Sequence, residues 1–164
     1  GTRARRPFRH ELVSALAYLQ VCRSLDPHRP TEFHSLVAFL IAAHHGKVRL
    51  AIRSHPEERR PRAPARRFAQ GVWEGDPLPD LSLTGLVSLP HIHLSLEPME
   101  LGTAEDLDDD ENPSWVARMV ALRDSPQWGP FRLAFLEALL RVADVRASQE
   151  HEAGGGKYGK GGDG

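Results

Sequence analysis

Cysteine is almost absent from this chain, and its scarcity narrows what the protein can be. The 164 residues include one cysteine, Cys22. A single cysteine excludes a disulfide within the chain and any zinc or iron–sulfur site built from several cysteines. We interpret Cys22 as an ordinary residue of a helix.

Long apolar runs are missing as well. The run SLVAFLIAA around Phe39 is far shorter than the ~20 residues that a membrane-spanning helix needs. No charged-then-apolar secretory segment opens the chain. These two absences predict a cytoplasmic protein with no membrane partner.

The chain has little net charge, but its two signs are segregated. The formal net charge is −1, with arginines crowded into residues 3–9 and 49–67 and a purely acidic run at 105–111. A basic face is therefore compatible with a neutral total. The length suits one domain with a buried core. Because the chain begins at Gly1 without a methionine, we expect it to be a piece of a longer product.

Helical periodicity dominates the two ends of the sequence. Leucines at helical spacing predict an amphipathic helix over residues 8–24, and a second apolar face predicts a helix over 32–45 with Gly46 as its C-terminal cap. Two more helices are expected, at 112–123 and at 131–148. The fold class predicted is mainly α.

The middle of the chain interrupts this pattern. From about residue 50 to 112 we expect an insertion, in which 81–89 and 91–96 alternate well enough to form a small β-hairpin. Residues 153–164 (AGGGKYGKGGDG) are too rich in glycine to bury a core and are predicted to be a disordered Gly-rich tail. The domain itself is placed at 1–152.

His44 and His45 are the first candidates for chemistry. Adjacent residues on a regular helix point about 100° apart, so the two imidazoles would not bind one metal ion comfortably from the middle of a helix. Where the helix is released at Gly46, they can converge, or each can serve one of two metal ions. The alternative is a plain helix end, at which the helix dipole favours histidine.

Two further residues extend the histidine pair to a possible metal site. His10 lies at the start of the first predicted helix, and Asp144 lies on the edge of the last apolar stripe. A buried carboxylate there would need a partner. A salt bridge from Asp144 to Arg141 or Arg146, and a solvated His10, are the alternatives.

Imidazole and carboxylate ligands suit manganese, iron, cobalt, nickel or zinc. Two such ions can lower the pKa of a bound water and neutralise a phosphate, which favours phosphodiester hydrolysis. His91 and His93 share one face of a predicted strand and are also compatible with metal binding. A half-exposed strand face is the favoured explanation for those two.

Three segments resemble a known family. RHELVSALA at 9–17, LVAFLIAAHHGKVR at 36–49 and LLRVADVRAS at 139–148 resemble the HD-type nuclease domain of the type I CRISPR-associated helicase-nuclease. GVWEGDPLP and LEPMELG resemble the variant with an insertion before the last aspartate. The resemblance covers about residues 8–150.

The resemblance implies an HD-domain-like helical bundle that binds one or two divalent ions and cuts single-stranded DNA. The implied metal ligands are His10, His44, His45 and Asp144, and the implied ion is manganese, iron, cobalt or nickel. The partners implied are a helicase part of the same system, in cis or trans, and a CRISPR surveillance complex. Lys47 and Arg49 follow the histidine pair, and we expect them either to bind DNA phosphates or to be ordinary solvated surface.

The chain departs from the family at one point. The His-Asp pair that names the family occurs nowhere in these residues, and its usual place precedes the motif of His10. We therefore expect an upstream segment to be missing, weak metal binding, and little or no cleavage by this chain alone. No catalytic residue can be named from the sequence.

Two alternative functions remain open from the sequence. A degenerate HD scaffold that docks on a helicase or surveillance complex fits the missing His-Asp pair. An HD phosphohydrolase acting on nucleotides would share the metal chemistry, but it would need a closed pocket with lysine or arginine around the phosphate.

Overall fold

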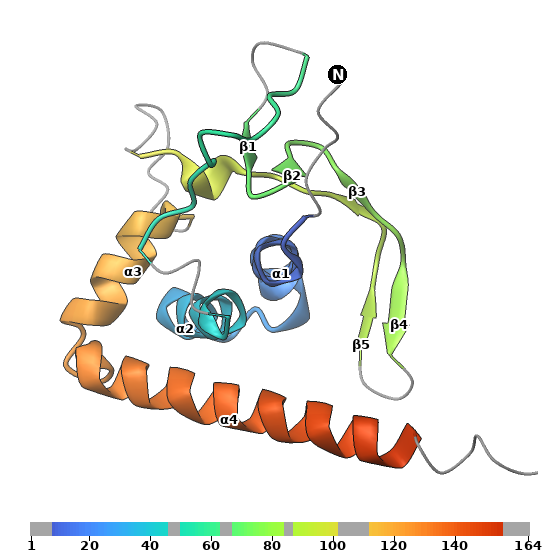
Figure 1. Ribbon diagram of the computed structural model, residues 1–164. Helices are drawn as coiled ribbons and strands as arrows, with labels where there is room; N and C mark the ends of the chain where they lie inside the picture. The colour runs from blue at the N-terminus through green and yellow to red at the C-terminus, as the bar shows by residue number, and fades with distance from the viewer. Residues whose placement is uncertain (1–7, 46–49, 63–66, 84–86, 102–111, 156–164) are drawn as a thin grey trace, which may run out of the picture.

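Four α-helices make up about half of the residues that the structure describes (Figure 1). The computed structural model describes residues 8–45, 50–62, 67–83, 87–101 and 112–155. The helices are α1 (His10–Leu25), α2 (Thr31–Ala43), α3 (Trp115–Asp124) and α4 (Gly129–Gly155), with a short 3₁₀-helix at Glu97–Met99. The predicted mainly α class, a helical bundle with a small β element, is confirmed.

Helices α1 and α2 form a helical hairpin at the centre of the molecule. They are the most extensively packed pair of elements, and only residues 26–30 connect them. A connection this short makes two packed helices antiparallel. The start of α1 is thereby placed beside the end of α2.

The core lies between this hairpin and α3. Leu12 and Leu16 of α1 and Phe39 of α2 are buried with Trp115 and Leu122 of α3. Each of these five side chains is less than a tenth exposed. Burial of large apolar side chains contributes about 1.5–3 kcal/mol each, so this layer is the main source of stability.

Ser114 defines the start of α3. Its Oγ accepts a hydrogen bond from the backbone N–H of Ala117 at 3.2 Å, which satisfies one of the free donors of the first turn. Trp115, Met119 and Leu122 of this helix are all buried.

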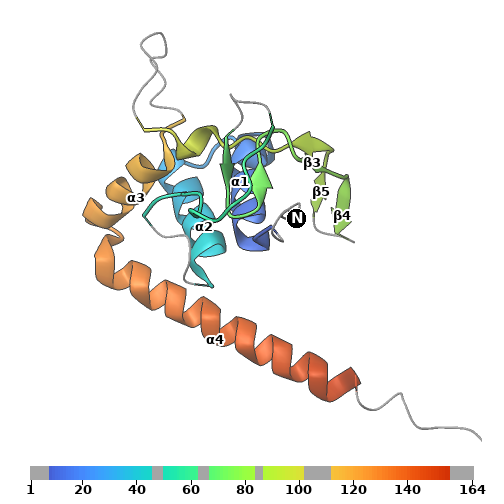
Figure 2. The same ribbon diagram turned by 45° about the horizontal axis from the view of Figure 1, so that its top comes forward.

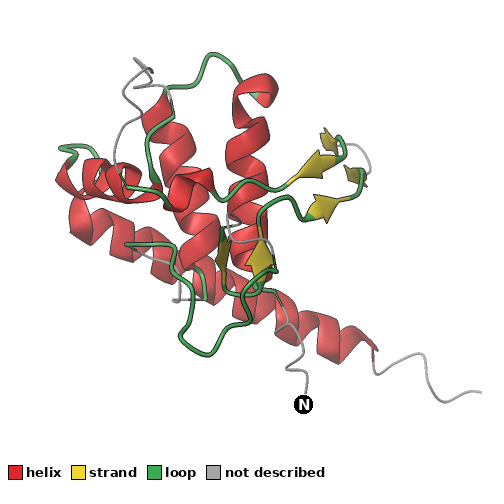
Figure 3. Cartoon of the chain, turned by 90° about the horizontal axis from the view of Figure 1, so that it is seen from above, coloured by secondary structure: helices red, strands yellow, loops and turns green. Residues whose placement is uncertain are grey.

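The described part of the insertion contains three antiparallel strand pairs. β1 (Phe68–Ala69) pairs with β2 (Val72–Trp73), β3 (Pro77–Leu78) with β6 (Ile92–His93), and β4 (Leu81–Leu83) with β5 (Val87–Leu89). A small hairpin is present as predicted, but its strands differ from those expected: β4 and β5 both lie within 81–89, and β6, from the expected second strand at 91–96, pairs with β3. The β3–β6 and β4–β5 pairs follow one another along one two-stranded ribbon. In Figure 3 this ribbon projects from one side of the helices.

The sequence did not predict the β1–β2 pair. Its turn has Gln70 and Gly71 at φ 52° and 83°, the two consecutive positive φ angles of a tight hairpin turn. The backbone N–H of Arg9 donates to the carbonyl of Gln70 at 3.2 Å. This turn therefore anchors the chain directly before α1.

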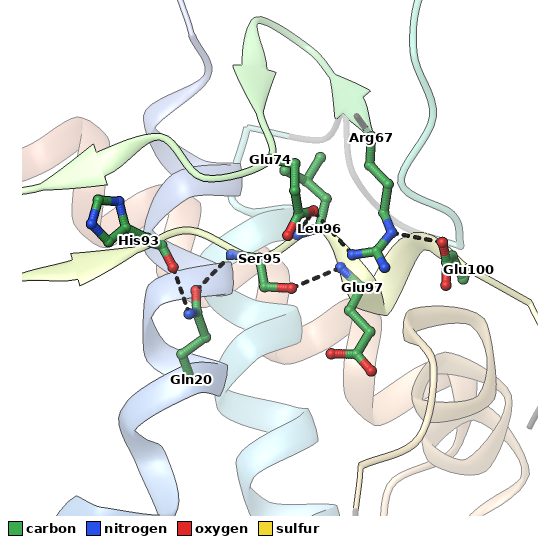
Figure 4. Close-up of polar contacts among 8 residues, drawn as sticks. All are labelled: Gln20, Arg67, Glu74, His93, Ser95, Leu96, Glu97 and Glu100. Atoms are coloured by element: carbon green, nitrogen blue, oxygen red, sulfur yellow. Dashed lines mark hydrogen bonds and ion pairs between the residues drawn. The ribbon is translucent and has the colours of Figure 1, made fainter. Parts of the chain in front are cut away.

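Side-chain contacts hold the insertion against α1 (Figure 4). The Gln20 amide donates to the carbonyl of His93 at 2.9 Å and accepts from the N–H of Ser95 at 3.0 Å. The segment from the end of β6 to Ser95 is thus fixed to α1 by the two polar groups of one side chain. Within the insertion itself, Arg67 forms ion pairs with Glu74 and Glu100, at 3.1 and 2.6 Å.

Helix α4 begins at a sharp corner and then leaves the bundle. Gly129 has φ 62°, and α4 packs on α3 and α2 through Leu133 and Glu137 near its start. Residues 138–150 are all exposed, and Figure 2 shows the far part of α4 extending beyond the other helices.

The last part of α4 corrects the predicted tail. The helix continues to Gly155, so the start of the tail at 153 was predicted three residues too early; residues 156–164 lie outside the described part of the chain. In the described ranges, no helix combines the length and apolar character needed to cross a membrane.

Candidate metal centre

The helical hairpin brings three of the predicted metal ligands together. His10 is the first residue of α1, and His44 is the C-cap of α2, with φ −59° and ψ −25°. Because α1 and α2 are antiparallel, the beginning of one and the end of the other meet. His45 follows directly and faces the same space.

The three imidazoles form a compact cluster. One ring nitrogen from each of His10, His44 and His45 can be chosen so that all lie within 4.8 Å of one another, and His10 Nε2 lies 3.1 Å from His45 Nε2. Metal–nitrogen bonds of roughly 2.1 Å place two tetrahedral ligands about 3.4 Å apart. The cluster could therefore hold a metal ion after small side-chain movements.

The imidazoles of the neighbouring residues His44 and His45 lie close together at the end of α2. The ring centroids of His44 and His45 are 4.0 Å apart, and that of His10 lies 5.8 and 4.9 Å from them. The rings converge from two helices and not from one regular helix.

A backbone contact orients His44. Its Nδ1 lies 2.6 Å from the carbonyl oxygen of Ile41. Because a carbonyl only accepts hydrogen bonds, the proton of a neutral His44 ring is on Nδ1, and Nε2 keeps its lone pair. A hydrogen bond of this kind commonly fixes a metal-binding histidine.

The cluster is open to solvent. The negative end of the α2 dipole and the positive end of the α1 dipole both lie beside it, so the two dipoles oppose each other. The side chain of His10 is 68% exposed, His45 is exposed and His44 is partly buried. An ion at this site would keep open positions for water or substrate.

Glu11 is a buried neighbour of the cluster that the sequence did not single out. Its side chain is 1% exposed, and its Oε2 lies 3.5 Å from His10 Nδ1. Among the described residues, neither carboxylate oxygen has a hydrogen-bond partner. A glutamate in the first turn of a helix is usually explained by the dipole alone, so the sequence carried no signal of this burial.

Asp144 does not join the cluster. The group of ligand atoms within 4.8 Å contains only the three histidines, and Asp144 is exposed on the part of α4 that leaves the bundle. The expectation that all four residues converge on one cleft is therefore not met. The reason is the course of α4, which packs on α3 and α2 only near its start.

The other predicted site residues divide into two cases. Lys47 and Arg49 lie outside the described residues, as does Gly46. His91 and His93 have ring centroids 5.0 Å apart, and His93 Nδ1 lies 3.3 Å from the carbonyl of Gly75. Within the described ranges these two belong to no group of three possible ligands.

A separate apolar groove of about 440 Å³ lies between α1 and the β3–β6 pair. None of the three clustered histidines lines it, and its walls carry no charged side chain. Its main lining residues are Val13, Tyr18, Val21, Ile41, Leu78 and Ile92.

The histidine cluster is the best-defined group of possible metal ligands in the described chain. Its members come from two helices whose packing fixes their approach. The residues themselves are the basis for assigning a function, because comparison of the chain with protein-family models, with curated proteins and with solved structures finds no match.

Proposed function

We propose that this chain is a metal-dependent nuclease domain of the HD type, which hydrolyses phosphodiester bonds of single-stranded DNA in CRISPR-Cas interference. The observation that carries the proposal is the convergence of His10, His44 and His45 from two helices. The order of these motifs along the chain resembles that family and supplies the choice of substrate.

The chemistry follows from the ligand types. A bound divalent ion would polarise a phosphodiester and acidify a water molecule. The three imidazoles would hold manganese, iron, cobalt or nickel, and the hydrogen bond to Ile41 leaves His44 Nε2 free for such an ion. The exposure of the cluster leaves room for a nucleic-acid strand beside it.

The proposed partners are single-stranded DNA and a helicase of the same system, in cis or trans. Lys47 and Arg49 follow the histidine pair in the sequence and would bind backbone phosphates. Such contacts weaken as salt concentration rises. A CRISPR surveillance complex would recruit the helicase and this domain together.

We expect little or no DNA cleavage by the 164 residues alone. They contain no His-Asp pair, and Asp144 does not lie with the three histidines. Metal binding is therefore the first measurement and cleavage the second.

The test uses Mn²⁺, Co²⁺ and Ni²⁺ in titration calorimetry. The wild type should bind, His44→Ala/His45→Ala should lose at least about tenfold in affinity, and His91→Ala/His93→Ala should bind like the wild type. The control removes a second neighbouring histidine pair outside the cluster. No binding by the wild type, or equal binding by the cluster variant, would refute the metal site.

Cleavage is then measured with labelled single-stranded DNA. Slow cleavage that requires the metal and disappears in His44→Ala/His45→Ala supports a nuclease. Metal binding with no cleavage above the rate of that variant, even when the expected upstream segment is supplied in cis or in trans, would overturn the nuclease and leave the scaffold. Activity on a mononucleotide but not on DNA would favour a nucleotide phosphohydrolase.

An exposed apolar face on α4 supports the scaffold as a second function. Five apolar residues of α4 follow one another at intervals of four and three, which places them on one face. Exposed apolar patches mark interaction surfaces. We name this face the α4 outer stripe; its residues are Phe131, Phe135, Leu139, Val142 and Val145, each at least half exposed. Helicase binding that survives loss of the histidines and is lost in Phe135→Glu/Leu139→Glu would support this second function.

A further inference from the structure

We infer that Glu11 is a positioning residue for His10. His10 Nδ1 lies 3.5 Å from the buried carboxylate, and a small approach of the ring would let this carboxylate accept a hydrogen bond from Nδ1–H. That bond would present the Nε2 lone pair to the metal ion. The metal-binding part of this inference rests on the proposed function.

The carboxylate of Glu11 is buried. Its side chain is 1% exposed, and its two oxygens have no hydrogen-bond partner among the described residues. A buried carboxylate without a donor is costly. The described cationic or donor groups beside it are His10 Nδ1 at 3.5 Å and Arg9 Nη1 at 4.0 Å.

The two nitrogens of the His10 ring face different neighbours. Nδ1 faces the Glu11 carboxylate, while Nε2 lies 3.1 Å from His45 Nε2. A proton on Nδ1 makes His10 Nε2 an acceptor, to which His45 Nε2–H can donate. The ring is thus held between a carboxylate and the centre of the cluster.

His44 has its Nδ1 beside an oxygen, as His10 does. There Nδ1 meets the oxygen of Ile41, and here Nδ1 meets an oxygen of Glu11. Two of the three rings therefore have the same nitrogen against an oxygen. Glu11 itself is not in the group of ligand atoms within 4.8 Å, so it lies behind His10 and does not bind the ion directly.

The ring state can be measured without any metal. Nitrogen-15 NMR of EDTA-treated protein, at a pH where the imidazoles are neutral, identifies which nitrogen carries the proton. We expect the proton of His10 on Nδ1 in the wild type and a shift toward Nε2 in Glu11→Leu. Glu11→Gln keeps an acceptor and the size of the side chain, so it should be intermediate and serves if Glu11→Leu does not fold. A wild-type His10 with its proton on Nε2 would overturn the inference.

Metal affinity is the second readout. We expect Glu11→Leu to weaken Co²⁺ binding by about 10–100-fold and Glu11→Gln by less. Arg9→Met, which removes the other nearby charge, should change the affinity little. Wild-type metal binding that is unchanged in both Glu11 variants refutes the role of Glu11 alone. Absence of wild-type binding refutes the proposed function, and the NMR result still decides the orientation of His10.

Discussion

His10 Nε2 and His45 Nε2 lie 3.1 Å apart although 35 residues separate them in the sequence. The contact exists because α1 and α2 are antiparallel and packed along their length. A ligand pair made in this way depends on the packing of the helices as much as on the histidines.

Metal binding should raise the thermal stability of the protein. An ion at 100 times its Kd stabilises the folded state by about 2.7 kcal/mol. We expect an upward shift of Tm with Co²⁺ in the wild type and in His28→Ala, whose histidine is exposed in the turn at the other end of the hairpin. His45→Ala should show no such shift in differential scanning fluorimetry. An equal shift in both variants would contradict the site.

Stability should fall at alkaline pH. Burial raises the pKa of the Cys22 thiol above 9.0 and that of Tyr18 above 10.0, so the unfolded chain loses these protons first. The stability that depends on them is present below pH 9.0 and decreases as the pH rises through the raised values. Urea midpoints from pH 8 to 10.5 should show the decrease, and Cys22→Ala should reduce it. A flat pH profile would exclude this account.

Arg118 should contribute strongly to the free energy of unfolding. It is 4% exposed and donates to Pro113, Ser35 and Asn112, at 2.9, 3.1 and 2.9 Å. Loss of these charge-assisted bonds should cost about 2–4 kcal/mol in Arg118→Met, measured by urea denaturation. Arg118→Lys should recover little, because an ammonium group cannot reach three separated acceptors. Near-wild-type stability of either variant would show that the network is dispensable.

The corner before α4 should favour residues that readily adopt a positive φ angle. A Cβ added at Gly129 would meet no atom within 4 Å, but the backbone has φ 62°. Gly129→Ala should therefore lose about 1 kcal/mol through backbone strain alone, and Gly129→Asn should lose less. Chemical denaturation of both variants tests the order, and equal stability of Ala and Gly would contradict it.

The α4 outer stripe should contribute nothing to the stability of the isolated chain. Phe135 is 62% exposed and Leu139 is 51% exposed, whereas Leu133 on the opposite side is 8% exposed. Phe135→Glu/Leu139→Glu should leave the urea midpoint unchanged, while Leu133→Ala should lose about 2 kcal/mol or more. A large loss in the stripe variant would mean that the stripe packs within the protein.

The sequence predicted the parts of the fold that have long repeating patterns. The spacing of Leu12 and Leu16 located α1, and the end of α2 was expected within two residues of where it lies. Strands β1 and β2 are two residues long, too short for any periodicity to be seen. The burial of Glu11 depends on tertiary packing, which no local pattern describes.

The candidate site divides along the same line. His10, His44 and His45 meet because neighbouring helices joined by a short turn have only one simple way to pack. The position of Asp144 depends on the corner at Gly129 and on the packing of α3, two steps further along the chain. Sequence reasoning found the residue types but could not fix the direction of α4.

The position of the histidine cluster at the open end of the α1–α2 hairpin has a mechanical consequence. Residues 26–30 close the other end covalently, and the chain, with its single cysteine, has no disulfide with which to close this one. An ion bound by His10, His44 and His45 would act as a reversible cross-link there. Helix ends are among the first parts of a protein to open, so loading and removal of the ion would switch the fraying of two helix ends at once, visible as amide exchange at residues near 12 and 43.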